Sequence, residues 1–152
     1  MSETLGSLCD KLTVVKLKQY HTGDEKHLQS LTVQEKQLQD EIDEFIEAAM
    51  SGRIPLERLT FAANKVYQRE GIMISDITGS VGEVFSKLSQ VSCDLWHEQE
   101  YVYEFEKVPP DKKNKVVKQL ALLNLVRNQC IERIDDQFQT LVAQYRDVGK
   151  TR

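Results

Sequence analysis

The sequence carries two groups of acidic residues whose spacing suits metal binding. Glu132 and Asp135 form an E-x-x-D pattern, and a second group lies far upstream: Asp40, Glu41, Asp43 and Glu44. Carboxylates three or four positions apart share one face of a helix, and carboxylate oxygens are ligands that magnesium prefers. One prediction is therefore a magnesium site formed by Asp40, Glu44, Glu132 and Asp135.

Such a site resembles a weakened form of the all-α nucleotide pyrophosphohydrolase motif, in which E-E-x-x-E is answered by E-x-x-D. That resemblance implies a magnesium-dependent hydrolase of nucleotides or phosphosugars. The sequence departs from the motif because Asp40 stands where the first Glu belongs and because about ninety residues separate the two groups. The alternative is that both groups are solvated faces of charged helices.

Asp94 and His97 have the carboxylate-x-x-His spacing of di-iron helical bundles. Such a bundle needs two copies of the pattern and two further carboxylates. The set is incomplete because Lys18, not a carboxylate, stands three residues before His21. We therefore expect His21 and His97 to be packing or hydrogen-bonding residues. No GxGxxG or P-loop motif suggests phosphate binding.

Two polar residues interrupt the apolar stripes of the predicted helices. Glu35 and Arg127 stand at stripe positions where leucine is expected. One prediction is a buried pair between them, which would specify how the two halves of the fold face each other more than it would stabilise them. The alternative is that each lies at the edge of its stripe and extends to water.

The elements that must position these residues are helices. Only seven Gly and three Pro occur in 152 residues, too few turns for an all-β fold. Breakers divide the chain into five predicted helices, over 3–21, 24–50, 55–69, 77–107 and 110–145. Four of them carry apolar stripes with the three-and-four spacing of bundle helices, among them a stripe from Leu28 to Ala49 and one from Leu120 to Leu141.

The striped helices are interpreted as two copies of one helical hairpin. Tyr20-His21 matches Trp96-His97 at an offset of 76 positions, and Ile42-Asp43 matches Ile134-Asp135 at an offset of 92. The difference places sixteen extra residues in the second hairpin, which would lengthen both arms so that it overhangs the first. Chance similarity between amphipathic helices is the alternative.

The fold prediction is one all-α domain over residues 1–152, resembling a four-helix bundle. Its parts are a first antiparallel hairpin over 3–51, a short linking helix over 55–69 and a second antiparallel hairpin over 77–146.

Aromatic residues gather where the second hairpin would overhang. Tyr101, Tyr103 and Phe105 stand there among glutamates. Uncovered aromatic rings of this kind indicate an interface, so we predict self-association through these three residues, with two-fold symmetry as the commonest arrangement. The alternative is that the linking helix covers them with Leu59, Phe61, Val66 and Tyr67.

Charge and composition narrow the function classes. The net charge is −4, with 20 basic residues spread among 24 acidic ones, so nucleic-acid binding is not expected. No stretch of eighteen apolar residues and no secretory signal stands out, so we expect no membrane span and no export. Cys9, Cys93 and Cys130 are widely spaced without a CxxC motif, which favours reduced thiols in a cytoplasm.

Two segments resemble the hallmark stretches of an uncharacterised bacterial family, the domain-of-unknown-function family 4254: DLWHEQE at 94–100 and LNLVRNQCIERID at 123–135. Residues 3–21 are similar to the N-terminal stretch of the same family. The resemblance covers most of the chain outside the linking helix and implies a helical, bacterial, cytoplasmic protein. It implies no accepted activity and no catalytic residues. The leading prediction is therefore an interaction or assembly module without a cofactor, either a homo-oligomer or the partner of another protein, and the magnesium-dependent hydrolase is the alternative.

Overall fold

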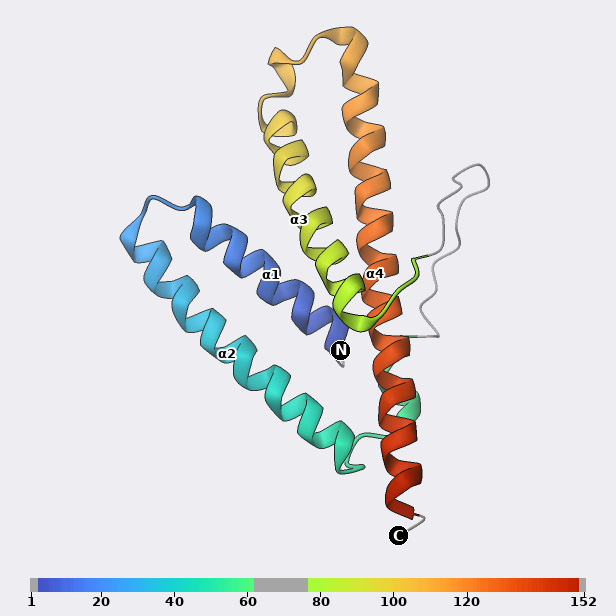
Figure 1. Cartoon of the computed structure of the whole chain (residues 1–152). Coiled ribbons are helices and arrows are strands. Elements are labelled where there is room, and N and C mark those ends of the chain that lie inside the picture. Colours follow the sequence, from blue (N-terminus) through green and yellow to red (C-terminus); the bar gives the residue numbers. More distant parts are fainter. Residues whose placement is uncertain (1–2, 62–76, 151–152) are drawn as a thin grey trace.

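The computed structural model describes residues 3–61 and 77–150, and two antiparallel helical hairpins make up this part of the chain (Figure 1). The first hairpin joins α1 (Leu5–His21) to α2 (Glu25–Met50), and the second joins α3 (Val81–Tyr103) to α4 (Pro110–Lys150). Short 3₁₀ turns, η1 (Leu56–Arg58) and η3 (Phe105–Lys107), follow α2 and α3. The all-α prediction is confirmed, and the described ranges contain no β-strand.

Side-chain caps determine where α1 and α3 begin. The Thr4 hydroxyl accepts a hydrogen bond from the Ser7 N–H, and the Ser7 hydroxyl accepts one from the Thr4 N–H at 2.9 Å. Ser80 and Glu83 form the same reciprocal arrangement before α3. These capping boxes satisfy N–H groups that a first helical turn leaves unpaired. Because Gly79 has a φ of +118°, outside the helical region, α3 begins at Val81 and not at residue 77.

Two predicted helices differ from the structure within the described residues. In the described part of the linking segment, the helical residues are the 3₁₀ turn Leu56–Arg58, and Leu59 after it is fully buried. The rest of the predicted linking helix, residues 62–69, lies outside the described residues. The α3 helix ends at Tyr103 because Glu104, with φ −113° and ψ 34°, leaves the helical conformation.

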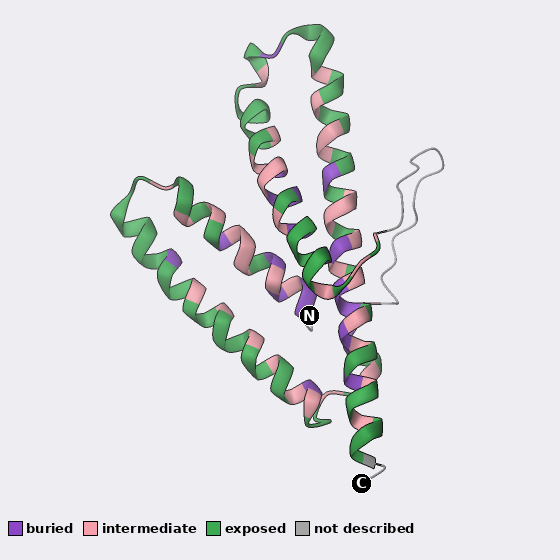
Figure 2. Cartoon of the chain, viewed as in Figure 1, coloured by how far each residue is buried: buried purple, intermediate pink, exposed green. Residues whose placement is uncertain are grey.

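The two hairpins diverge from a common base (Figure 1). The α1 helix packs against each of the other three helices, while α2 packs along α1 and meets α4 near the C-terminal ends of both. Much of α2 is therefore exposed (Figure 2). The second hairpin has the longer arms, with 23 residues in α3 against 17 in α1 and 41 in α4 against 26 in α2. Its tip stands clear of the first hairpin (Figure 1).

The main core lies where the hairpins meet at the base (Figure 2). It contains Leu5, Ala49, Leu59, Val84, Leu88, Cys130, Ile134, Phe138 and Val142. A smaller cluster joins α3 to α4 and contains Val91, Leu95 and Leu123. None of the described helices combines the length and the apolarity needed to cross a bilayer.

The predicted stripes agree with this core except at two ends. Leu28 and Leu141 are 41% and 54% exposed, whereas Val142 is fully buried. A seven-residue repeat drifts by about 20° per heptad relative to an α-helix. Over three heptads of α4 this drift turns Leu141 away from the core and places Val142 in it.

Candidate functional site

The four carboxylates predicted to hold magnesium do not come together. Asp40 is exposed and pairs with Lys36 one turn away, and Glu44 and Glu132 are also exposed. Asp135 is only 1% exposed. Within 3–61 and 77–149 there is no group of three or more His, Cys, Asp or Glu side chains that could hold a metal ion. The hydrolase alternative therefore lacks its predicted site in this part of the chain.

Asp135 instead ties α4 to the beginning of α1. Its Oδ1 accepts a hydrogen bond from the Gly6 N–H at 2.7 Å, and the Thr4 side chain also hydrogen-bonds the carboxyl group. Burial raises the pKa of Asp135 from 3.8 to about 6, although both hydrogen bonds oppose the shift. The carboxyl group is a buried structural contact that titrates close to neutral pH.

The predicted pair between Glu35 and Arg127 is wrong. Arg127 binds the Asp10 carboxylate with two nitrogens, and its Nε donates to Oδ1 at 2.8 Å. Glu35 accepts hydrogen bonds from Lys16 at 2.9 Å and from Gln19 at 2.8 Å. Both residues contact α1, because α2 and α4 meet only near their C-terminal ends and each packs on α1 further from the base (Figure 1). The Arg127–Asp10 pair is the more buried of the two contacts, with the Asp10 side chain 7% exposed.

The predicted interface residues lie at the free tip of the second hairpin. Tyr101 and Tyr103 are 54% and 86% exposed. Phe105 is half-buried, and the Lys113 ammonium lies 4.9 Å from its ring centroid. Because α3 ends at Tyr103, Phe105 belongs to η3 and not to the helix that carries the two tyrosines.

The described part of the linking segment does not cover the tip. Leu59 is buried in the core at the base, and the η1 turn before it packs on α4. Of the other residues expected to provide cover, Phe61 is half-buried, and Val66 and Tyr67 lie outside the described residues. The tyrosines of the tip are thus exposed to solvent in the described chain.

A hollow of about 640 Å³ lies at the same tip, between the end of α3 and the start of α4. Its apolar lining is Tyr101, Val108, Pro109 and Val116. Its polar lining contains Glu98 of α3, Glu104 and Lys107 of the turn, which pair at 3.3 Å, and Lys112, Lys115 and Gln119 of α4. The tip therefore combines a concave surface with exposed aromatic rings and charges of both signs.

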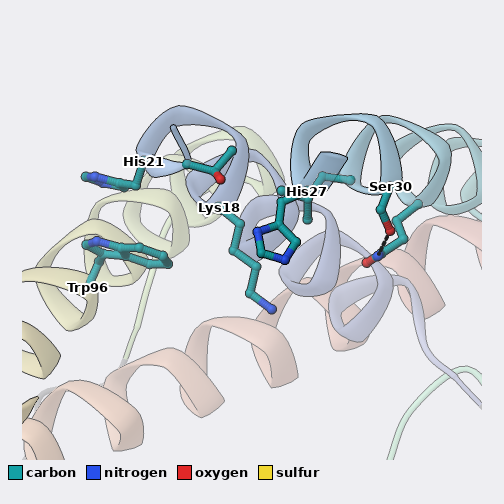
Figure 3. Close-up of a pocket in the computed structure, with 8 residues that line it drawn as sticks. Lys18, His21, His27, Ser30 and Trp96 are labelled. Atoms are coloured by element: carbon teal, nitrogen blue, oxygen red, sulfur yellow. Dashed lines mark hydrogen bonds between the residues drawn. The ribbon is translucent and has the colours of Figure 1, made fainter. Parts of the chain in front are cut away.

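A second hollow lies where the turn of the first hairpin approaches α3 (Figure 3). The His21 ring at the end of α1 stacks on the Trp96 ring of α3, with centroids 4.6 Å apart and planes 9° apart. His21 was expected to be a packing residue, but its partner was missed. The sequence repeat matches Tyr20-His21 with Trp96-His97. Spacing along the chain does not show that His21 contacts Trp96.

Comparisons of the chain with known protein families, with curated proteins and with solved structures found no match.

Proposed function

We propose that this protein is an assembly module in which two copies join through the tips of their second hairpins. The observation that carries the proposal is the exposed Tyr103 ring on a tip that also contains an open hollow. In a two-fold dimer both copies present the same surface to each other. A projecting side chain and a hollow on one tip are therefore self-complementary, since each copy's Tyr103 can enter the other's hollow.

The charges of the tip favour a second copy of this chain as the occupant. The end of α3 and the turn after it are mostly acidic, with Glu98, Glu100, Glu104 and Glu106, although Glu104 pairs with Lys107 in the same turn. The first turns of α4 are rich in lysine, with Lys112, Lys113, Lys115 and Lys118. An antiparallel arrangement places the acidic arm of one copy against the basic arm of the other. Such charge complementarity contributes specificity and association rate more than affinity.

The apolar area at the centre of the proposed interface determines how tightly we expect the dimer to form. Each tyrosine ring can bury about 150–250 Å², and each copy contributes two exposed rings, Tyr101 and Tyr103. An interface built on four rings is at the small end of specific interfaces, where complexes are transient. We therefore expect a reversible, concentration-dependent dimer that weakens as salt screens the charged arms.

Sedimentation velocity over a range of protein concentrations tests the proposal. The parent chain should move from monomer to dimer as concentration rises, and Tyr101→Ser combined with Tyr103→Ser should remain monomeric with unchanged helicity. Tyr145→Ser is a matched control, because Tyr145 lies near the opposite end of α4 and is 56% exposed against 54% for Tyr101. A parent chain that stays monomeric at the highest concentration would refute the proposal.

A second apolar surface of the protein is the alternative dimer interface. A hollow of about 800 Å³ between α1 and α3 is lined by Leu12, Leu17, Tyr20 and Phe85, among others. At its rim Lys16 and Glu35 already pair with each other, so this surface offers no separated charges to a second copy. If Phe85→Ser abolishes dimerisation and the tip variant does not, the interface has been assigned to the wrong surface.

We also propose a reducing, cytoplasmic location. Cys9, Cys93 and Cys130 are free thiols, and Cys130 is buried. Free thiols are typical of reducing compartments, and the resemblance to the bacterial family 4254 supports the same expectation.

A further inference from the structure

The hollow beside the His21–Trp96 stack has the shape and the polarity of a small ligand site. Its volume is about 330 Å³, within the range of small-molecule pockets. Three helices contribute to it, and none of the eight lining residues is acidic: Lys18, His21, Thr22, His27, Ser30, Leu31, Gln34 and Trp96. In a chain with a net charge of −4, a pocket without a carboxylate in its lining is a distinct electrostatic environment.

The polar side of the pocket is rich in hydrogen-bond donors. The Ser30 hydroxyl already accepts a hydrogen bond from Gln34, and the Thr22 hydroxyl accepts one from the Asp24 N–H, both at 3.3 Å. Each hydroxyl keeps its own proton available for donation. Lys18 forms no ion pair with another described residue, and its ammonium can only donate.

The histidine of α2 is held in place from outside the pocket. His27 Nδ1 lies 3.1 Å from Asp24 Oδ2, a contact that is an ion pair when the imidazole is protonated. Asp24 thus contacts a lining residue through His27 Nδ1, but Asp24 itself is not part of the pocket lining. Figure 3 shows Lys18 between the His21–Trp96 stack and the side chains of His27 and Ser30.

Two apolar side chains also line the pocket. The Trp96 indole, stacked under His21, forms one end of the hollow (Figure 3), and Leu31, 8% exposed, contributes an aliphatic surface. A flat ring packs well against such a surface because aromatic rings bury a large apolar area and favour stacked or edge contacts. The hydrogen-bond donors and the apolar side chains of the pocket together suit a ligand with one anionic end and one flat ring.

We propose that this pocket binds a small phosphate monoester that carries a flat ring, of the size and chemistry of a nucleoside monophosphate. The phosphate accepts a charge-assisted hydrogen bond from Lys18, the Ser30 and Thr22 hydroxyls are further donors along the pocket, and the ring packs against Trp96 or Leu31. The site is separate from the tip of the second hairpin, so this inference does not rest on the proposed dimer.

The chain supplies its own reporter, because Trp96 is the one tryptophan in the sequence. The experiment follows Trp96 fluorescence while adenosine monophosphate, adenosine or inorganic phosphate is added, each over the same millimolar range. Adenosine monophosphate should give a saturable change, and the other two should bind at least about tenfold more weakly, because each makes only one of the two sets of contacts.

Two variants separate this pocket from a general charge effect. Lys18→Gln should weaken binding of adenosine monophosphate by about tenfold, since a charge-assisted hydrogen bond is lost. Lys26→Gln removes the same charge from an exposed position at the same end of the first hairpin, outside the pocket lining, and should weaken binding by less than about twofold. Circular dichroism checks that both variants keep their helicity.

Four results would overturn the proposal. The first is that none of the three compounds produces a saturable change. The second is that inorganic phosphate binds as tightly as adenosine monophosphate, which would make the pocket a simple anion site, and the third is that adenosine does so, which would make the phosphate contacts irrelevant. The fourth is that Lys18→Gln and Lys26→Gln weaken binding equally.

Discussion

The backbone N–H of Gly6 donates a 2.7 Å hydrogen bond to Oδ1 of Asp135, at a point where α1 and α4 approach closely. A Cβ atom at Gly6 would lie 2.6 Å from the Ile131 carbonyl oxygen and 2.8 Å from Asp135 Oδ1. Such distances are too short for any side chain, so the close approach requires glycine. This contact anchors the first hairpin to the second at the base of the fold.

Replacement of Gly6 by alanine should therefore destabilise the protein. The added methyl group must push α1 away from α4, and overpacking of this kind costs about 1–3 kcal/mol. Gly82→Ala is the matched control, because Gly82 is also helical and has open space around its Cβ position. Urea unfolding should show a lower free energy of unfolding for Gly6→Ala and an equal or higher one for Gly82→Ala.

The titration of Asp135 should make stability depend on pH in an unusual direction. Its pKa of about 6 in the folded protein exceeds the ordinary value of 3.8, so between these values the folded state holds more protons than the unfolded state. The free energy of unfolding should therefore rise as pH falls through about 6. Relative to Asp135→Asn, which cannot titrate, the parent should gain roughly 1 kcal/mol between about pH 8 and pH 5.

Urea unfolding of the two proteins at both pH values measures this difference, and the other titrating groups cancel in the comparison. An Asp135→Asn variant with the same pH dependence as the parent would mean that the Asp135 carboxyl group has an ordinary pKa.

Loss of the arginine from the Arg127–Asp10 pair should leave a buried charge without its partner. Arg127→Met removes both hydrogen bonds to a carboxylate that is 7% exposed, which should cost roughly 2–3 kcal/mol of unfolding free energy. The double change Asp10→Leu with Arg127→Met should recover part of the loss, because the uncompensated charge is gone. If the double variant is less stable than Arg127→Met alone, the orphaned charge is not the cause.

The register of α4 can be tested with two identical substitutions. Leu123 is 7% exposed and Leu141 is 54% exposed. Leu123→Ala should therefore cost about 2–5 kcal/mol, whereas Leu141→Ala should change stability by less than about 1 kcal/mol. Thermal unfolding measures the difference, and equal melting temperatures for the two variants would contradict the burial of the α4 stripe.

The fold could be predicted from the sequence because helix formation here is a local property. Breakers, caps and apolar spacing determine α1, α2 and α4 closely, and Leu123 and Ile134 of the α4 stripe are buried as expected. The errors occur where one residue changes the backbone, as at Gly79 and Glu104, or where helical drift accumulates, as at Leu141.

The candidate sites were less predictable because they depend on which helices become neighbours. Glu35 and Arg127 interrupt the stripes, but they do not pair: Glu35 binds Lys16 and Arg127 binds Asp10, because α2 and α4 each pack on α1 away from the base. The stacking of His21 on Trp96 likewise follows from the angle between the two hairpins, and no spacing along the chain records that angle.

The assembly at the tip can be tested most directly by energy transfer between labelled copies. Cysteines introduced by Glu106→Cys, next to the tip tyrosines, and separately by Ser51→Cys, at the base, would carry the dyes in a Cys93→Ser background. The remaining thiols should stay unlabelled, because Cys130 is buried and burial raises the pKa of Cys9 to about 11.

For each site, donor-labelled and acceptor-labelled batches are mixed and the transfer is followed as concentration rises. The tip-to-tip dimer predicts strong transfer for residue 106 that disappears when Tyr103→Ser is added, and little transfer for residue 51. No transfer at residue 106, or transfer at residue 51 of equal strength, would contradict it.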